Sequence, residues 1–381
     1  MKSLMFRLHY ISIVVYFLFV GCKNNESPSE IITNRESVVS YAASFDIFNY
    51  DDYRVITVKK AWPDTDRHFK YALIKEGVTI SNPSDYDAVI TVPIQTLAAT
   101  STTHLPSLEM LNEVESLVGF AELDFISSEK IRSRIEAGKI AELGKNEALN
   151  TEVLIDLAPE VVVGFAMDGI NATYKNIQNS GIPVLYNADW TETSPLGKAE
   201  WIKFFGALFA KDEEAEKIFE TIKSEYENVK NLAKEASDIP DVLYGAMYRD
   251  IWHVPGGDSW GAKFIEDANG NYLWKDERGT GGLALSLETV LEKGQHADIW
   301  IAPAQYSTLE SLEKASQVYT QFNSFKTNQI YNYTAKKGPT GGYIYFELAP
   351  NRPDLVLKDL VKIFHPELLP DHQLYFYSQL K

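Results

Sequence analysis

The segment Gly257-Asp-Ser-Trp-Gly261 matches G-x-S-x-G, the pattern that carries the nucleophilic serine of α/β-hydrolases. Asp298 and His365 follow it in the chain order of the acid and the base in those enzymes. The pattern requires a strand that runs directly into the turn of the serine, and Pro255 interrupts any strand ahead of Ser259. A surface serine hydrolase is therefore an alternative hypothesis rather than the leading one.

The histidines offer little support for a metal site. None of the seven has the His-x-x-x-His or His-Glu-x-x-His spacing of a zinc site. His104 and His253 fall near loops that we assign below to a ligand crevice, where an imidazole could ligate a haem iron or titrate, although a solvated loop histidine is the simpler interpretation. Because the chain has no GxxxxGK[ST] loop, any ATP hydrolysis belongs to a partner.

Cys22 is the only cysteine of the chain, and its position indicates lipidation. Lys2 and Arg7 precede an apolar run over residues 11–20, which has the length of a signal-peptide core and is too short to span a bilayer comfortably. The run ends at Gly21-Cys22, which resembles a bacterial lipobox, whose cysteine is diacylated and becomes the first mature residue. The alternative is an ordinary buried or free thiol.

Charge and length restrict the class of protein. After removal of residues 1–21, 34 basic residues face 53 acidic ones, a charge of −19. This charge argues against nucleic-acid binding, which depends on basic groups that neutralise phosphates. Residues 22–41 begin with a polar, proline-containing stretch and are predicted to form a tether to the membrane. About 360 mature residues predict more than one domain.

The elements that must position any site fall into four segments. Residues 42–80 read as a small β extension. Strands then alternate with helices over residues 81–210, which predicts an α/β lobe. Residues 211–237 carry acids at the start and one apolar stripe, typical of a single long helix. A second α/β lobe is predicted over residues 238–381.

The order and spacing of several segments resemble the helical-backbone class of ABC-importer substrate-binding proteins, which serve ferric siderophores, haem and cobalamin. The resemblance covers roughly residues 85–370. It implies an α/β fold in which two Rossmann-like lobes with mainly parallel sheets are joined by a long rigid backbone helix. The segments that carry it are Asn150-Thr-Glu-Val-Leu-Ile-Asp-Leu-Ala-Pro-Glu-Val-Val-Val-Gly, Ser180-Gly-Ile-Pro-Val, the paired helices at 198–236, Pro255-Gly-Gly-Asp-Ser, Leu285-Ser-Leu-Glu-Thr-Val-Leu, Ala297-Asp-Ile-Trp-Ile and Arg352-Pro-Asp-Leu-Val-Leu.

In that family one surface glutamate on each lobe docks into arginine pockets of the permease. By position, the resemblance implies this role for Glu152 and Glu288. Each is predicted to lie in the first turn of a helix, where a carboxylate is favoured by the helix dipole and is accessible to a guanidinium group. The alternative is a routine acid at a helix start.

The ligand would lie at the carboxyl ends of the strands, between the facing lobes. The loops expected there are rich in glycine and in aromatic residues that could stack on catecholate, corrin or porphyrin faces. Arg249 is the cation among them and could offset an anionic chelate. The ligand-binding residues predicted from these loops are Trp190, Tyr248, Arg249, Trp252, Tyr306, Tyr343 and Tyr345.

The leading hypothesis is a non-enzymatic, lipid-anchored component of an ABC importer. It would capture an iron complex, foremost a ferric siderophore, and deliver it to a permease and its ATPase, with no cofactor or resident metal of its own. Cobalamin or haem is the alternative ligand within the same family. From other classes, the hydrolase that uses Ser259 and an interaction lipoprotein without a small ligand remain open.

Overall fold

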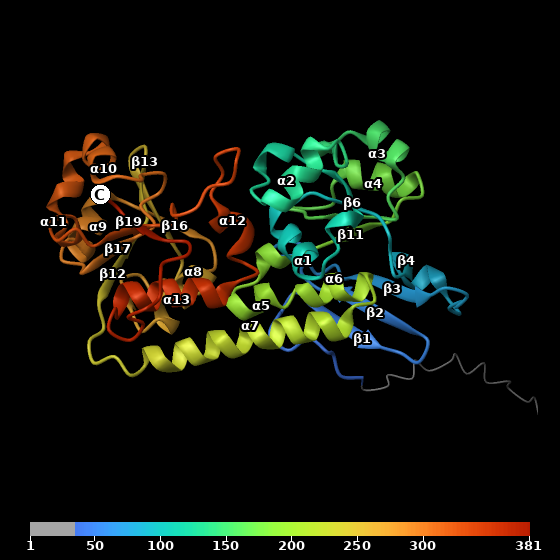
Figure 1. Ribbon diagram of the computed structural model, residues 1–381, viewed down its shortest axis with the longest axis horizontal. Helices are drawn as coiled ribbons and strands as arrows, with labels where there is room; N and C mark the ends of the chain where they lie inside the picture. Colours follow the sequence, from blue (N-terminus) through green and yellow to red (C-terminus); the bar gives the residue numbers. More distant parts are fainter. Residues whose placement is uncertain (1–34) are drawn as a thin grey trace, which may run out of the picture. The chain divides into compact units, whose positions relative to one another are not determined.

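In the computed structural model, residues 35–381 are described, so the predicted signal segment and Cys22 lie outside the described residues. Residues 36–381 form one unit (Figure 1). The chain begins with β1 (Phe45–Asn49), β2 (Tyr53–Val58) and β3 (Phe69–Lys75), an antiparallel meander. A fourth strand, β4 (Ala88–Val92), pairs in parallel with β3. The small sheet therefore takes a strand from residues that the sequence assigns to the first lobe.

The first lobe is built on a parallel sheet with the order β11-β10-β5-β6-β7. The strand β10 (Val161–Gly164) is buried along its whole length, as expected where helices cover both faces of a sheet. The other strands and the helices of this lobe are β5 (Leu97–Ala99), β6 (Leu117–Phe120), β7 (Ala141–Glu142), the hairpin β8 (Gly144–Lys145) and β9 (Ala148–Leu149), β11 (Val184–Tyr186), α1 (Leu105–Met110), α2 (Glu129–Glu136), α3 (Thr151–Leu157) and α4 (Ala172–Asn179).

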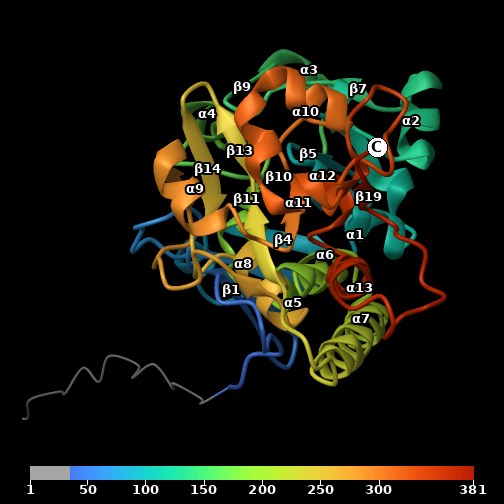
Figure 2. The same ribbon diagram turned by 90° about the vertical axis from the view of Figure 1, so that its left-hand side faces the viewer.

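A long helix, α7 (Asp212–Ala233), runs past both lobes (Figure 1). Its 22 residues span about 33 Å at 1.5 Å per residue. At the first lobe it packs against α6 (Ile202–Leu208), which follows α5 (Pro195–Ala199), and at the second lobe against α13 (Pro353–Phe364). Figure 2 looks nearly along α7, with α13 beside it. The predicted backbone helix is therefore present.

The second lobe has a five-stranded sheet in the order β15-β12-β17-β18-β19, parallel except for β19, and a separate three-stranded antiparallel sheet, β13-β14-β16. The predicted α/β class with two mainly parallel sheets is confirmed. The elements are β12 (Asp241–Tyr244), β13 (Ala246–Tyr248), β14 (Ile251–Pro255), α8 (Trp260–Asp267), β15 (Asn271–Tyr272), β16 (Gly282–Leu285), α9 (Leu287–Gly294), β17 (Ile299–Ile301), α10 (Leu309–Ala315), α11 (Asn323–Lys326), β18 (Ile330–Asn332), α12 (Ile344–Leu348) and β19 (Ser378–Gln379).

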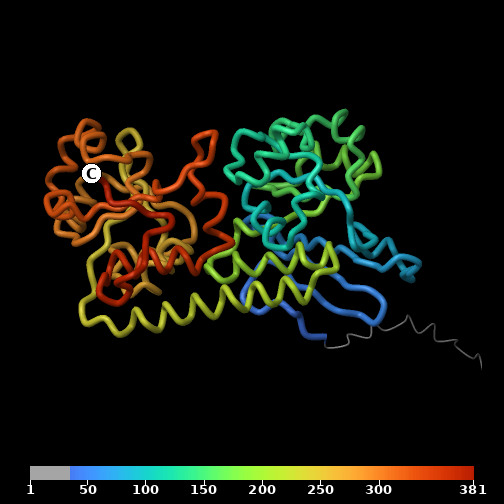
Figure 3. The backbone as a smooth tube through the Cα atoms, in the orientation of Figure 1, coloured from blue at the N-terminus to red at the C-terminus, as the bar shows by residue number. Residues whose placement is uncertain are grey.

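The lobes touch through α12 and the turn that leads into it, which stand next to the first lobe in the tube view (Figure 3). The Glu347 carboxylate accepts the backbone N–H groups of Ser127 and Ser128, at 2.7 and 3.1 Å. A Cβ atom on Gly338 would lie 2.5 Å from the Cα of Ser127, so only glycine fits this approach.

Within residues 35–381 no helix has the length and apolar character needed to cross a bilayer.

Candidate functional site

A cavity of about 420 Å³ lies at the carboxyl edge of the second-lobe sheet. Tyr244 ends β12, and Tyr333 directly follows β18, so both side chains come from the edge where open α/β sheets bind ligands. The remaining walls come mainly from α8, α12, the strand β14 and the turn that leads into β16. The side chains that define the cavity are mainly aromatic: Tyr244, Trp260, Tyr333, Tyr345 and Phe346, with His253 and Ser259 at its margin.

The aromatic rings of the cavity form a stacked cluster. Tyr333 and Tyr345 are nearly parallel, with ring centroids 4.9 Å apart and an interplanar angle of 18°. Phe346 meets the ring of Tyr333 edge-on at 5.0 Å, and Trp260 lies 6.5 Å from Tyr345. Phe346 is nevertheless 55% exposed, which is unusual for a phenylalanine so close to a core. The cluster therefore offers an apolar surface suited to a flat or apolar ligand face.

The tyrosines of this cluster are neutral. Burial raises the pKa of Tyr345 well above the usual value for a phenol, and burial also raises the pKa of Tyr333. A phenolate ligand to iron would require each hydroxyl to lose its proton in a buried setting, which costs free energy. The rings are better suited to stacking and hydrogen bonding than to metal coordination.

The structure brings together only part of the predicted aromatic set. Tyr343 and Tyr345 join the cluster, with Tyr343 6.1 Å from Tyr333. Tyr306 is half-buried beside Tyr319, and Trp190 is half-buried after β11; neither lines the cavity. Tyr244, Trp260, Tyr333 and Phe346 also line the cavity and were not predicted from the sequence. Tyr333 could have been predicted from the sequence, because a residue that directly follows a parallel strand lies at the edge of the sheet where ligands bind.

Trp252 occupies a different place from the one expected. Its side chain is 0% exposed and stacks on Trp300 at 5.4 Å, and its indole N–H donates to the carbonyl oxygen of Tyr244. The reason is the alternation of β14, in which Trp252 and Val254 point inward while Ile251 and His253 point outward. In this arrangement Trp252 has no ring face available to a ligand.

Tyr248 and Arg249 lie at the tip of the β13–β14 hairpin and do not line the cavity. Tyr248 is 64% exposed, and the guanidinium of Arg249 lies 5.4 Å from the centroid of its ring. Arg249 has a φ of 56°, so it occupies the tight turn of the hairpin in the left-handed region. The cation that the sequence assigns to the crevice is therefore on an exposed tip, beside the strand that contacts α9.

Glu152 and Glu288 both lie exposed in the first turn of a helix, on different lobes, as predicted for their positions. The side chains of Asn150 and Ser286 cap these helices by accepting the N–H groups of Val153 and Thr289. Hydrogen bonds from its own backbone N–H and from Ser286 lower the pKa of Glu288. Their docking role stays a prediction.

The three residues of the hydrolase pattern have separate partners. The Ser259 hydroxyl is buried and caps α8 by accepting the N–H of Ala262 at 3.2 Å. Asp298 accepts the N–H of Asp241, and the ring of His365 lies against the carbonyl oxygen of Ala268. No catalytic triad forms among them. Residues 35–381 also contain no cluster of three side chains suited to hold a metal ion.

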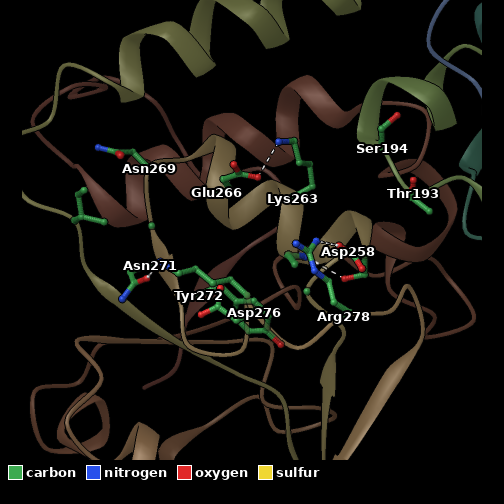
Figure 4. A pocket seen from close by; sticks show the side chains of 16 residues that line it. Thr193, Ser194, Asp258, Lys263, Glu266, Asn269, Asn271, Tyr272, Asp276 and Arg278 are labelled. Atoms are coloured by element: carbon green, nitrogen blue, oxygen red, sulfur yellow. Dashed lines mark hydrogen bonds and ion pairs between the residues drawn. The ribbon is translucent and has the colours of Figure 1, made fainter.

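A larger cavity, of about 990 Å³, lies on another side of α8 (Figure 4). Four of its charged side chains form two ion pairs: Lys263 pairs with Glu266 at 2.8 Å, and Arg278 pairs with Asp258 at 2.8 Å. Figure 4 shows both pairs at the wall of the cavity. Because these charges already have partners at an open surface, they give the cavity no preference for a charged ligand.

Comparison with known proteins finds relatives in sequence and in fold. Two uncharacterized lipoproteins of Methanocaldococcus jannaschii are similar in sequence, one 28% identical over 76% of this chain and 69% of its own length, the other 23% identical over 99% of both. Two solved structures have a similar fold, each 18% identical with a TM-score of 0.56 over 72% of this chain and 99% of the other: a possible iron-binding (periplasmic solute-binding) protein of Staphylococcus epidermidis and a periplasmic haem-binding protein of Roseiflexus.

A family model described as periplasmic binding protein matches residues 97–336, a range that includes most of the first lobe, the whole of α7 and the second-lobe strands that border the cavity. The match takes in more than half of the chain and parts of both lobes. The chain therefore belongs to the periplasmic binding protein family.

Proposed function

We propose that this protein captures an iron chelate, foremost a ferric siderophore, between its lobes and delivers it to an ABC permease. The chain is a substrate-binding protein of the ABC-importer type and not an enzyme. The finer assignment is supported by the aromatic cavity at the ligand edge of the second lobe, with Phe346 exposed on neutral, stacked Tyr333 and Tyr345. A possible iron-binding protein and haem-binding proteins among the similar structures agree with this class of ligand.

Glu152 and Glu288 would dock on the permease, since each is an exposed carboxylate at a helix start on its own lobe. Diacylation of Cys22, which lies outside the described residues, would hold the protein at a membrane. Lipoproteins among the sequence relatives support the anchor.

The test is ligand binding by the purified protein, followed as quenching of tryptophan fluorescence during titration with a ferric siderophore, haem and cobalamin. We expect submicromolar affinity for an iron complex. Phe346→Ala should weaken binding about tenfold or more, because one exposed ring supplies stacking area. Ile155→Ala is the matched control, since Ile155 is 49% exposed on α3 and does not line the cavity.

An absorbance spectrum of the protein isolated from its host identifies the ligand independently. A ferric charge-transfer band would support a siderophore as the ligand. A Soret band would indicate haem instead, and a corrin band would indicate cobalamin. A protein that binds none of the three, with Phe346→Ala without effect, contradicts the proposal.

A further inference from the structure

The turn that follows β11 contains buried hydrogen-bond donors without acceptors. The side-chain Nδ2 of Asn187 and the indole Nε1 of Trp190 have no hydrogen-bond partner, and the imidazole of His104, from the turn that precedes α1, has none either. Asn187 and His104 are almost completely buried. Buried polar groups are nearly always hydrogen-bonded, so donors left unpaired at the carboxyl edge of the first-lobe sheet indicate a place for an acceptor.

Lys198, on α5, brings a positive charge to the same turn. Its ammonium donates to the carbonyl oxygen of Asp189 at 2.8 Å and lies 5.1 Å from the centroid of the Trp260 ring. Asp189 belongs to the turn after β11, and Trp260 lines the second-lobe cavity. Lys198 therefore sits between the ligand edge of the first lobe and the aromatic cavity of the second.

The charge of Lys198 is buried and incompletely compensated. The side chain is 6% exposed, and among residues 35–381 no carboxylate forms an ion pair with its ammonium. Burial lowers the pKa of Lys198, against the opposing charges of Asp189 and Glu192. Burial also lowers the pKa of His104 to about 4, against the opposing charge of Asp189, so this imidazole is neutral and adds no cation. A buried charge of this kind is costly unless it is paired, which indicates that a partner is missing from the ligand-free protein.

We propose that Lys198, together with the free N–H groups of Asn187 and Trp190, binds a carboxylate oxygen of the ligand while its apolar part lies on the rings of Tyr333, Tyr345 and Phe346. This inference rests on the proposed function and narrows it to iron chelates that carry carboxylates. From the sequence, Arg249 was expected to select an anionic ligand by its charge. The inference assigns this role to Lys198, at the junction of the lobes, instead.

The test compares Lys198→Met with Lys293→Met. Lys293 is exposed on α9, and its ammonium lies 5.9 Å from the ring centroid of Trp274, so the control removes the same charge from the face of a tryptophan that does not line the cavity. Dissociation constants are measured for ferric citrate, for citrate without iron and for a neutral ferric trihydroxamate. We expect Lys198→Met to raise the dissociation constant of ferric citrate at least tenfold and that of the trihydroxamate less than twofold. Lys293→Met should change neither constant.

Thermal unfolding without ligand separates a binding role from a structural one. If Lys198 is held for a ligand, Lys198→Met raises the Tm of the ligand-free protein, because methionine fills the site without a buried charge. A fall in Tm, equal weakening of both iron complexes, or no weakening of either overturns the inference. Lys198→Gln serves as the second variant if the methionine variant does not fold.

The proposed function and this inference fail in distinguishable ways. Tight binding of the trihydroxamate without any binding of carboxylates overturns the inference and leaves the iron-chelate proposal standing. Binding of iron-free citrate that depends on Lys198, with no preference for iron, keeps the subsite and overturns the iron-chelate proposal. A wild-type protein that binds no probe contradicts both.

Discussion

The carboxylate of Glu347 in the second lobe accepts the backbone N–H of Ser127 in the first, at 2.7 Å, and also that of Ser128. Ser128 is the N-cap of α2, so a side chain of one lobe completes the start of a helix in the other. Burial raises the pKa of Glu347 to about 7, Glu109 on α1 adds to the rise, and the two N–H groups oppose it. The contact between the lobes is therefore sensitive to protonation.

Stability should fall as the pH rises through this range. The carboxyl of Glu347 has a raised pKa in the folded protein, so its protonated form is favoured there, and the stabilisation present below an ordinary pKa of 4.5 is lost as the pH approaches and passes 7. The measurement is the free energy of unfolding between pH 4.5 and 8. Glu347→Gln should flatten the slope; an unchanged slope in that variant assigns the pH dependence to other groups.

Trp252→Ala should destabilise the protein by about 3–5 kcal/mol, the usual cost of truncating a large aromatic side chain in a core. Trp252 is wholly enclosed by Trp300, Tyr319 and Phe322, and it holds the end of β12 through its indole N–H. Chemical denaturation measures the loss. If Trp252 instead contacted ligand, the variant would lose affinity with little change in stability.

Ser259→Ala should cost about 1 kcal/mol of stability, the usual value for an N-cap. The hydroxyl caps α8 and has no base beside it, so hydrolysis of p-nitrophenyl esters should be at the buffer rate in both proteins. If the wild type cleaves esters and the variant does not, the alternative hypothesis of a serine hydrolase that uses Ser259 would be supported.

Charge reversal at Glu152 and Glu288 should impair uptake and spare capture. Both carboxylates are exposed and outside the aromatic cavity, so the dissociation constant of the ligand in solution should stay within twofold. Uptake of labelled ligand by cells that carry the double Glu→Arg protein tests the coupling to the permease. Normal uptake would show that neither residue docks. Lys293→Ala, on the same helix as Glu288, is the surface control.

Cys22→Ala should release the protein from the membrane with an unchanged affinity for its ligand. Loss of the acyl chains removes about 0.8 kcal/mol of membrane binding per buried methylene. Fractionation after a high-salt wash gives the readout, and a variant that stays in the membrane fraction contradicts lipidation at this cysteine.

The repeating patterns of the sequence were enough to predict the α/β class and the long helix, but not every element. The apolar stripe of residues 211–237 predicted α7, and the alternation of strands and helices predicted the lobes. The parallel pairing of β4 with β3 was not predictable, because the sequence near Ala88 carries no information about which strand lies beside it. Such pairings are decided by packing between distant segments.

The candidate site was harder to predict than the fold. A position in a loop near a strand end does not determine where a side chain points. Trp252 was assigned to the crevice on that ground, whereas the alternation of β14 turns its side chain inward. Lys198 was read only as part of a helix, because burial of a lysine depends on the opposite lobe. The inward position of Trp252 and the burial of Lys198 both depend on tertiary surroundings, which one sequence does not display.

Two glutamates of the first lobe accept hydrogen bonds from the backbone at the start of the described chain. Glu200 accepts the N–H groups of Ser40, Tyr41 and Ala42, and Glu192 accepts those of Ala43 and Ser44. Glu200 also binds the ammonium of Lys203 on α6. Val38 in turn donates to the carbonyl oxygen of Ile47 in β1 and accepts from the ammonium of Lys203, so tension on the chain ahead of residue 38 would be shared between β1 and the helices next to α7. The first lobe would thus provide a mechanical anchor for the start of the chain, and the residues that line the aromatic cavity take no part in these contacts.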